Sequence, residues 1–332
     1  MKPPHFWSAG LDPKSREAAP LTRALLTPVE ALYIWGFKRR WKKATPAPAP
    51  VPIICVGNVT VGGVGKTPIV ALIRERVGEM GYRAASLSRG HGGRLKGPVK
   101  VDPAEHDAGD VGDEPLMLAC SGESWIGRDR AAAATAMANA GVDVIVMDDG
   151  FQTPSVEKTL SFLVIDGEAG FGNGYCLPKG PMREPYNTAN ERADHSVITG
   201  DAKRLPEALL NGAFRTRLVP RAGAPDGPLV AFAGIGRPTK VFDSLKAAGA
   251  DLRDGVGFGD HYVYKQSDID FLRKLAKDHG ARLITTEKDY VRLPEDWREG
   301  ILAWPVTMDF GDDLERLDEV LQTAIETFNH EA

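Results

Sequence analysis

Residues 51–67, VPIICVGNVTVGGVGKT, place the strongest constraint on what this chain can fold into. The segment starts with a β-branched apolar run, becomes rich in glycine and ends in Gly-Lys-Thr, followed by Pro68 and by apolar residues at helical spacing. A strand, a glycine loop and a helix in this order form a phosphate-binding P-loop. The segment therefore predicts an α/β domain in which a buried strand leads directly into a nucleotide site.

The loop of this segment supplies the predicted nucleotide contacts. Glycine has no Cβ, so backbone amides can approach phosphate oxygens, and the helix that follows directs its positive end at them. We expect Lys66 to reach the β- and γ-phosphates and Thr67 to bind Mg²⁺ through its hydroxyl. Thr60 stands where the usual motif has glycine, and a glycine-rich turn with a surface lysine is the structural alternative. The predicted contacts are Thr60, Val61, Gly62, Gly63, Val64, Gly65, Lys66 and Thr67.

An acidic pair, Asp148 and Asp149, follows the apolar run 142–147. That run is typical of a buried strand. Carboxylates after such a strand, downstream of a P-loop, are the expected partners of Mg²⁺. Two adjacent carboxylates at a buried strand end are unfavourable unless a cation or hydrogen-bond donors pair with them. We therefore predict that both residues hold the metal, directly or through water.

Two more charged pairs lie at predicted helix starts, and each allows two interpretations. Asp113 and Glu114 follow a glycine at a loop-to-helix junction. Carboxylates there either cap the helix or face the nucleotide. Arg128 and Arg130 precede the alanine-rich run 131–140, where they suit an anionic ligand, although surface arginines are common. The residues alone leave both pairs open.

Composition narrows the classes of function. The chain has 332 residues, 42% of them apolar, which is enough for two domains. A net charge of −4 argues against a general nucleic-acid binder. The three cysteines are scattered without metal-ligand spacing, which indicates a reducing, intracellular setting. No apolar run approaches the roughly 20 residues of a spanning helix, and the first residues lack a signal-peptide pattern.

Residues 1–45 form an unusual N-terminal segment. Residues 27–30 match a capping box with proline at the first helical position, and the helix predicted from there carries aromatic residues before a basic run at 38–43. Aromatic bulk beside a basic cluster is typical of a helix that lies on an anionic membrane surface. The alternative is a helix packed on the core with its positively charged end exposed. The two interpretations are compatible.

The rest of the chain alternates predicted strands and helices, which favours a mostly parallel sheet covered on both faces. A run rich in Gly, Pro and Ala at 221–228 marks a linker. A second βα series follows, and it ends in a strand at 301–306 and an amphipathic helix at 314–328. We therefore predict the N-terminal segment 1–45, a P-loop domain at 46–220 and a smaller C-terminal α/β domain at 221–332.

Several motifs together resemble the tetraacyldisaccharide 4′-kinase family. They follow one another across nearly the whole chain, and their combination is far more specific than a P-loop alone. Thr60 fits the family's own version of the loop. The matching stretches are Val56-Gly57-Asn58, residues 60–68, Ser88-Arg89-Gly90, Gly112-Asp113-Glu114-Pro115, Gly127-Arg128-Asp129-Arg130, Asp148-Asp149-Gly150-Phe151-Gln152, Leu177-Pro178, Gly180-Pro181, Arg183-Glu184-Pro185, Asp260-His261-Tyr262 and residues 285–289.

The resemblance implies a reaction and a location. The enzyme would use Mg²⁺ and move the γ-phosphate of ATP to the 4′-hydroxyl of a tetraacyldisaccharide 1-phosphate, which gives lipid IVA for lipid A synthesis. The active site would lie in the cleft between a P-loop domain and a smaller C-terminal α/β domain. The lipid substrate lies in the cytoplasmic leaflet of the inner membrane. A peripheral enzyme on that face would touch the anionic surface through its N-terminal segment, and no nucleic acid is involved.

The resemblance also gives roles to individual residues. Phosphoryl transfer requires positioning, charge neutralisation and removal of the hydroxyl proton. Asp113 would be the base, paired with His261 from the second domain, so that the base is complete only when the domains close. Without the resemblance, a histidine on a loop is more often a surface residue. Lys66 and Arg183 would neutralise the transferred phosphate. The predicted substrate contacts are Glu114, Arg128, Arg130 and Arg183.

Two other functions share parts of this pattern. Partition-type and chaperone-type NTPases also carry Gly-Gly-Val-Gly-Lys-Thr, but they often have a lysine early in the loop, where this chain has Val61. A membrane-docked nucleotide sensor would bind ATP without transferring phosphate, which leaves Asp113 and the acidic pair without a role. Phosphate transfer to a lipid disaccharide distinguishes the kinase from both.

Overall fold

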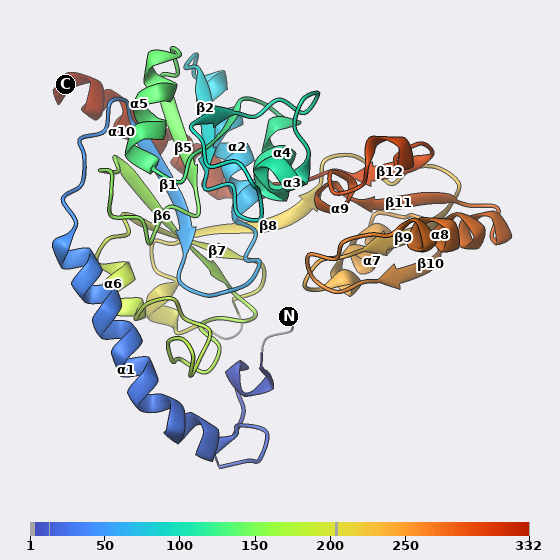
Figure 1. Ribbon diagram of the computed structural model, residues 1–332, viewed down its shortest axis with the longest axis horizontal. Helices are drawn as coiled ribbons and strands as arrows, with labels where there is room; N and C mark the ends of the chain where they lie inside the picture. The colour runs from blue at the N-terminus through green and yellow to red at the C-terminus, as the bar shows by residue number, and fades with distance from the viewer. Residues whose placement is uncertain (1–3, 13, 203–204, 332) are drawn as a thin grey trace.

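The computed structural model describes residues 4–12, 14–202 and 205–331, and in that part of the chain two β-sheets each carry helices on both faces (Figure 1). The larger sheet has the strand order β13-β8-β7-β6-β1-β5-β2-β4-β3, parallel except at its outer pairs β13–β8 and β3–β4. The predicted α/β fold is thus confirmed. The nine strands are β1 (Ile53–Asn58), β2 (Ala84–Ser88), β3 (Val99–Lys100), β4 (Ser124–Ile126), β5 (Val144–Asp148), β6 (Leu160–Asp166), β7 (His195–Thr199), β8 (Phe214–Pro220) and β13 (Val306–Asp309).

Strand β1 is buried on both faces, as its continuous apolar run predicts. Its side chains alternate: Ile54 packs with helices α2 and α10, and Ile53 packs with α5 on the opposite face. The register pairs Val56 with Asp148 of the parallel neighbour β5. The glycine loop and the acidic pair therefore meet at one edge of the sheet. The helices of this domain are α2 (Lys66–Glu79), α3 (Ala108–Val111), α4 (Asp113–Ala119), α5 (Arg130–Asn139), α6 (Tyr186–Asn190) and α10 (Leu314–Glu331), with 3₁₀ turns η2 (Glu207–Leu209) and η4 (Gly311–Asp313).

The smaller sheet has four parallel strands in the order β10-β9-β11-β12. Helix α7 packs on one face and α8 on the other. A short helix, α9, starts directly after β11 and contacts α4 of the larger domain. The elements are β9 (Pro228–Ala233), α7 (Pro238–Ala247), β10 (Asp251–Gly257), α8 (Gln266–Asp278), β11 (Arg282–Thr286), α9 (Glu287–Tyr290), η3 (Glu295–Trp297) and β12 (Ile301–Trp304).

The end of the chain returns to the larger sheet, which differs from the division predicted at 221–332. One strand was predicted at 301–306, but Pro305 lacks an amide N–H and separates β12 in the smaller sheet from β13 in the larger one. Strand β13 pairs antiparallel with β8, and α10 packs against α2 through an apolar stripe that includes Leu317 and Leu321. Two chain segments therefore join the smaller domain to the larger one.

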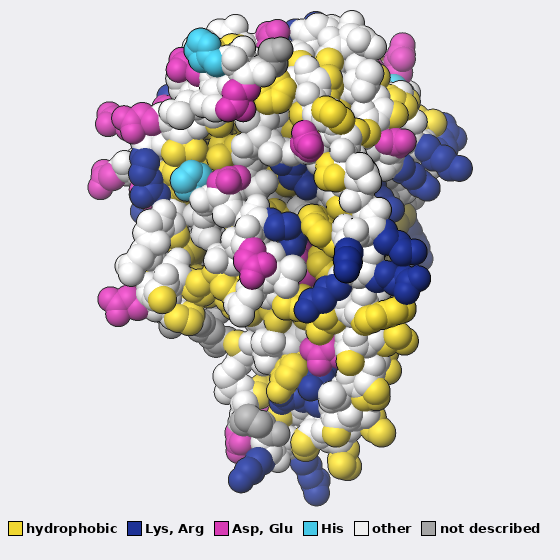
Figure 2. Space-filling model, turned by 90° about the vertical axis from the view of Figure 1, so that its left-hand side faces the viewer, with side chains coloured by type: hydrophobic (Ala, Val, Ile, Leu, Met, Phe, Trp, Pro, Cys, Tyr) yellow, Lys and Arg dark blue, Asp and Glu magenta, His cyan; other side chains and the backbone are white. Residues whose placement is uncertain are grey.

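Helix α1 (Pro20–Lys43) begins earlier than the capping box predicted at Thr27. Pro20 takes the first helical position, Pro28 lies inside the helix, and the Thr27 hydroxyl donates to the carbonyl of Arg23 at 3.0 Å. The fixed φ of Pro20 suits the first position of a helix, which accounts for the earlier start. The helix runs along the outer side of the larger domain, on the face shown in Figure 2. It follows η1 (His5–Trp7), and residues 1–3 and 13 of the predicted N-terminal segment lie outside the described residues.

Candidate active site

The glycine loop connects β1 to the start of α2, as predicted. Gly65 has a φ of 84° and Gly62 a φ of 113°, which side chains with a Cβ rarely adopt. Apart from the adjacent residues of the chain, no described atom lies within 4 Å of a Cβ built on Gly62 or Gly63. The open space at these glycines leaves room for a phosphate group. A backbone hydrogen bond holds the loop in place: the amide of Val61 donates to the carbonyl of Pro181 at 2.9 Å.

Lys66 sits at the first position of α2 and points back toward the strand ends. Its Nζ donates to Asn58 Oδ1 at 2.9 Å and lies 3.3 Å from Asp149 Oδ1. Asn58 ends β1 and is fully buried. Its amide fixes the lysine beside the acidic pair, so the ammonium is held in place at the loop. The sequence motif that contains Asn58 did not predict its contact with Lys66.

Asp148 is the residue best suited to a cation. It is 2% exposed, and its Oδ2 accepts a hydrogen bond from the Thr67 hydroxyl at 3.3 Å. Its Oδ1 is buried and has no hydrogen-bond partner among the described residues. Burial, followed by the charge of Glu114, raises the pKa of this carboxyl to about 7. A buried carboxylate with one unsatisfied oxygen beside a hydroxyl fits Mg²⁺, which takes oxygen ligands.

No cluster of three or more His, Cys, Asp or Glu able to hold a metal occurs among the residues that the structure describes. In phosphate-transfer sites Mg²⁺ uses one or two carboxylates and takes its other ligands from the nucleotide and water. Thr67 and Asp148 are therefore the residues that fit the ion most directly.

Asp149 differs from its neighbour because cations already surround it. The Arg183 Nη1 lies 2.8 Å and 2.7 Å from its two carboxylate oxygens, and Lys66 Nζ lies 3.3 Å from Oδ1. Burial alone would raise the pKa of this carboxyl, but the charges of Lys66 and Arg183 outweigh burial and lower it. Its φ of 53° lies in the left-handed region, which residues other than glycine rarely adopt. Asp149 therefore places Arg183 at the loop.

Asp113 and His261 meet across the two domains, as predicted from the resemblance. Asp113 is the first residue of α4, and its Oδ2 lies 3.2 Å from His261 Nδ1. His261 has a φ of 53° and lies in the loop between β10 and α8. Its side chain is 53% exposed, so the ring also faces open space. The pair can therefore act on a group that enters between the domains.

Arg292 is a site residue that the sequence analysis missed. Its Nε donates to Asp113 Oδ2 at 3.0 Å, and its Nη2 contacts the same oxygen. Its Nη1 donates to Asp289 Oδ1 at 2.9 Å and to the carbonyl of Gly234 at 3.0 Å. Burial would raise the pKa of Asp113, but the hydrogen bond from His261 and the charges of Lys288 and Arg292 hold it well below its usual range. Asp113 is thus an ionised carboxylate that side chains of the smaller domain hold in place.

Comparison with known proteins decides which P-loop enzyme this is. The sequence profile of the tetraacyldisaccharide-1-P 4′-kinase family matches residues 22–326. The chain belongs to this family. It is 58% identical to the tetraacyldisaccharide 4′-kinase of Hyphomonas neptunium, with 97% of both chains covered, and 47% identical to that of Maricaulis maris, with 94% and 93% covered.

A solved structure supports the same fold. The crystal structure of LpxK from Aquifex aeolicus in complex with ATP superimposes with a TM-score of 0.74 at 23% identity, covering 92% of this chain and 99% of that chain. Membership of the 4′-kinase family makes this chain an ATP-dependent phosphotransferase that acts at the 4′ position of a lipid A precursor. The predicted identity, reaction and nucleotide are confirmed, and the NTPase-switch and sensor alternatives are set aside.

The remaining residues predicted to bind the kinase's substrate lie in different settings. Glu114 Oε1 pairs with Lys288 Nζ at 3.3 Å, so it adds a second contact between the domains. Arg128 is exposed, and its Nη2 donates to the carbonyl of Gly93 at 3.4 Å. Arg130 is 3% exposed, and burial lowers its pKa to about 10, opposed by the charge of Asp148. Its Nε has no hydrogen-bond partner. Arg130 is therefore a buried cation whose charge interacts with Asp148, and Arg128 is an exposed arginine with one backbone contact.

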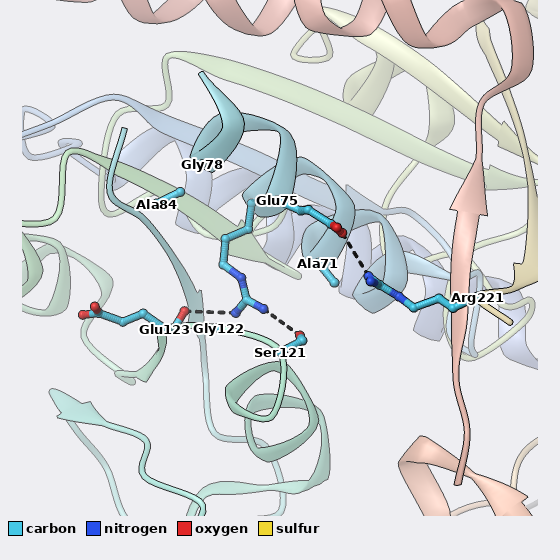
Figure 3. Close-up of a pocket in the computed structure, with 9 residues that line it drawn as sticks. Ala71, Glu75, Gly78, Ala84, Ser121, Gly122, Glu123 and Arg221 are labelled. Atoms are coloured by element: carbon cyan, nitrogen blue, oxygen red, sulfur yellow. Dashed lines mark hydrogen bonds and ion pairs between the residues drawn. The ribbon is translucent and has the colours of Figure 1, made fainter. Parts of the chain in front are cut away.

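A cavity of about 270 Å³ lies apart from these residues, between α2 and the loop after α4 (Figure 3). The Arg74 guanidinium on its wall donates to the carbonyl of Leu118 at 2.9 Å and to the Ser121 hydroxyl at 2.7 Å. No residue predicted for the active site lines this cavity. Arg74 instead ties the P-loop helix to the end of α4. It thereby fixes the helix that carries Asp113 relative to the nucleotide loop.

Proposed function

We propose that the kinase holds ATP on residues 60–67, with Lys66 at the β- and γ-phosphates, and that Thr67 and the acidic pair would hold Mg²⁺. The open glycines, the fixed lysine and the unsatisfied oxygen of Asp148 support this arrangement. When bound, Mg²⁺ neutralises charge on the phosphates. Arg183 lies beside Asp149 at the same edge and adds a positive charge for the transferred phosphate.

The proton of the attacking hydroxyl is the second part of the proposal. Asp113 stays ionised at neutral pH, so it accepts a hydrogen bond from the 4′-hydroxyl and orients it. Its lowered pKa makes it a weak final proton acceptor. His261 donates its Nδ1–H to the same oxygen, which leaves Nε2 of the neutral ring as the atom that accepts the proton. A loose phosphoryl-transfer transition state needs little basicity, because the hydroxyl loses its proton late. The contact between Asp113 and His261 across the domains carries this proposal.

Phosphate transfer to lipid tests the proposal as a whole. The protein is mixed with γ-labelled ATP and tetraacyldisaccharide 1-phosphate in detergent micelles, with and without Mg²⁺. Label that enters the lipid only when Mg²⁺ is present supports the arrangement. Release of labelled inorganic phosphate at the same rate with or without lipid contradicts it.

The contacts of Arg292 support a role for this residue in closing the active site. It holds Asp113 from the smaller domain, and this domain is joined to the larger one by two segments. We therefore propose that the smaller domain closes over the nucleotide and that Arg292 and Lys288 hold it shut on the two carboxylates of α4.

Replacing Arg292 by Gln is expected to lower turnover about tenfold, because the base is less well positioned. It also removes a positive charge that helps to lower the pKa of Asp113 against the effect of burial. The pKa of Asp113 then rises, so the acid limb of the kcat/KM profile moves to higher pH. The native ion pair contributes stability above the unfolded pKa of Asp113 and loses it as the pH falls, so the stability difference between variant and parent shrinks in acid.

A pH–rate profile and thermal unfolding at two pH values check these effects. Arg273→Gln is the control, because Arg273 is an exposed arginine of the same domain that donates to the carbonyl of Trp297. An unshifted acid limb in the Arg292 variant contradicts the assignment.

The exposed side chains of helix α1 favour contact with a membrane. Among the described residues, no helix combines the length and apolar character needed to cross a bilayer. The outer side of α1 carries an apolar stripe, which we define as Leu21, Leu25, Val29, Leu32 and Trp35, each between 48% and 81% exposed. A run of exposed basic residues follows it at the end of the helix: Lys38, Arg39, Arg40, Lys42 and Lys43. On the face that carries α1, Lys and Arg side chains gather beside hydrophobic ones (Figure 2).

We therefore propose that the apolar stripe enters the acyl region of the cytoplasmic face of the inner membrane. The basic residues then contact anionic headgroups, so that the enzyme binds as a peripheral protein. This brings the acylated substrate to the edge of the larger domain.

Replacing Leu25 and Leu32 together by Ser is expected to weaken binding to vesicles that contain anionic lipid by at least about tenfold, because two exposed leucines no longer enter the acyl region. Sedimentation with vesicles measures this. Phe271→Ser removes another exposed apolar side chain, on α8, and serves as the control. Equal vesicle binding by the double variant and the parent protein contradicts docking through the stripe.

A further inference from the structure

Helix α1 has a second stripe, on the side opposite the exposed one. Residues 30, 33, 37 and 41 are spaced by three or four positions, so they share one face of the helix. Glu30 and Phe37 are buried there, and Tyr33 and Trp41 are partly buried. This inner stripe does more than bury apolar surface: Glu30 and Tyr33 make polar contacts with the segment that contains Arg183, and Trp41 makes a cation–π contact with Arg192.

Glu30 and Tyr33 bind the long connection between β6 and α6. The Glu30 Oε1 accepts a hydrogen bond from the amide of Cys176 at 2.7 Å, and its Oε2 lies 3.5 Å from Lys179 Nζ. The Tyr33 hydroxyl donates to the carbonyl of Arg183 at 2.8 Å. The connection lacks regular secondary structure from residue 167 to 185, so side-chain contacts from α1 replace the support that a sheet or helix would give it.

Arg183 is therefore held from two sides. Its amide donates to the carbonyl of Val59, at the end of β1, at 2.6 Å, and its carbonyl accepts from Tyr33 of α1. Its guanidinium reaches Asp149. The backbone that aims this side chain is fixed between the nucleotide loop and the helix that faces the membrane.

Glu184, the residue after Arg183, is also linked to α1. Glu184 is fully buried and pairs with Arg192 at 2.6 Å, and Gln152 donates to its other oxygen at 3.0 Å. The Arg192 guanidinium lies over the Trp41 ring of α1, 4.0 Å from its centroid. Gln152 also donates to the carbonyl of Asn58, so a chain of contacts runs from α1 to the end of β1.

We propose that α1 is a positioning element for catalysis and that Tyr33 is the positioning residue that aims Arg183 at the transferred phosphate. The outer side of one helix then meets the membrane while its inner side fixes an active-site arginine. The proposal rests on the roles proposed above for Arg183 and for α1. It separates the two faces: changes on the outer side alter membrane binding, and changes on the inner side alter the chemical step.

The test removes one oxygen atom. Tyr33→Phe keeps the ring and loses the hydroxyl, and kcat is measured in detergent micelles at saturating lipid. One hydrogen bond that orients a catalytic group predicts a loss of about five- to tenfold in kcat, with vesicle binding unchanged. Tyr186→Phe is the matched control, because Tyr186 also lies beside this segment and its hydroxyl donates to Asn190 within its own helix. Its kcat is expected to match that of the parent enzyme.

A second background shows whether the effect passes through Arg183. In an Arg183→Ala enzyme, Tyr33→Phe is expected to cause less than about a twofold further loss, because the side chain that it aims is gone. Equal losses in both backgrounds, or an unchanged kcat in Tyr33→Phe alone, overturn the proposal. Parent-level turnover by Arg183→Ala alone refutes the role of Arg183 itself, and this outcome is visible before Tyr33 is altered.

Discussion

Replacing Asp113 by Asn is expected to lower turnover by about 10²- to 10³-fold while ATP affinity changes little. The amide is close in size to the carboxylate, but it lacks the negative charge that orients the 4′-hydroxyl. It also cannot act with His261 in removing the proton of that hydroxyl. Asp113 lies at the contact between the domains rather than on the glycine loop, so nucleotide binding is largely spared. Loss of kcat with a nearly constant Kd for ATP identifies a group that acts in the transition state.

His261→Ala is expected to cause a loss of similar size, about 10²-fold or more. The double variant should be little worse than either single one, because residues that act as a unit are not additive. Asp260→Asn is the control, since Asp260 is the carboxylate next to His261 in the same loop, 4.0 Å from its other ring nitrogen. Phosphate transfer in micelles and calorimetric titration with ATP give the two quantities. Near-normal turnover in both single variants would show that another group receives the proton.

The nucleotide side of this site could be predicted because it is encoded locally. Lys66 and Thr67 follow a glycine loop within one short segment, and Asp148 ends a strand whose apolar run is visible in the sequence. Parallel pairing of β1 and β5 then brings these pieces to one edge without any further information. Asn58 was within reach of the same reasoning, because a polar residue at the end of a fully buried strand requires a partner.

The contacts between the domains could not be predicted in this way. Arg292 and Asp113 are 179 positions apart, and their contact depends on how α9 meets α4. The one local sign of Arg292 is its spacing of three residues from Asp289, with which it forms an ion pair. His261 was predicted only through the family's motif, because a half-exposed loop histidine carries no pattern of its own.

Long-range pairing also explains why the prediction of a single strand at 301–306 was wrong. Residues 306–309 form a β-strand, but nothing in their sequence says that the strand pairs with β8 instead of continuing the smaller sheet. Pro305 was the available sign of a break. The start of α1 was misjudged for the opposite reason. A good local match at residues 27–30 was preferred to Pro20, which suits the first helical position and is where the helix begins.

Replacing Lys66 by Met is expected to lower turnover by about 10³-fold, the largest effect predicted for this enzyme. Methionine keeps an unbranched chain of similar length but loses the charge that meets the β- and γ-phosphates as negative charge moves toward the leaving group. Asn58 holds the ammonium at 2.9 Å, so the charge is already in place before ATP arrives and little reorganisation is needed. A charge that is fixed in this way stabilises the transition state more than the bound ground state.

Single-turnover transfer to the lipid and calorimetric binding of ATP separate these two contributions. Lys158→Met is the control, because Lys158 is a partly buried lysine of the same domain whose Nζ donates to the carbonyl of Thr153 at 2.7 Å, outside the glycine loop. A large loss of kcat with ATP affinity reduced by less than about tenfold places the action of Lys66 in the transition state. Equal losses of affinity and turnover would instead mean that the lysine binds substrate and transition state alike. Retention of more than a tenth of the parent turnover would contradict the role of Lys66 and would favour Arg183, which also pairs with Asp149, as the source of that charge.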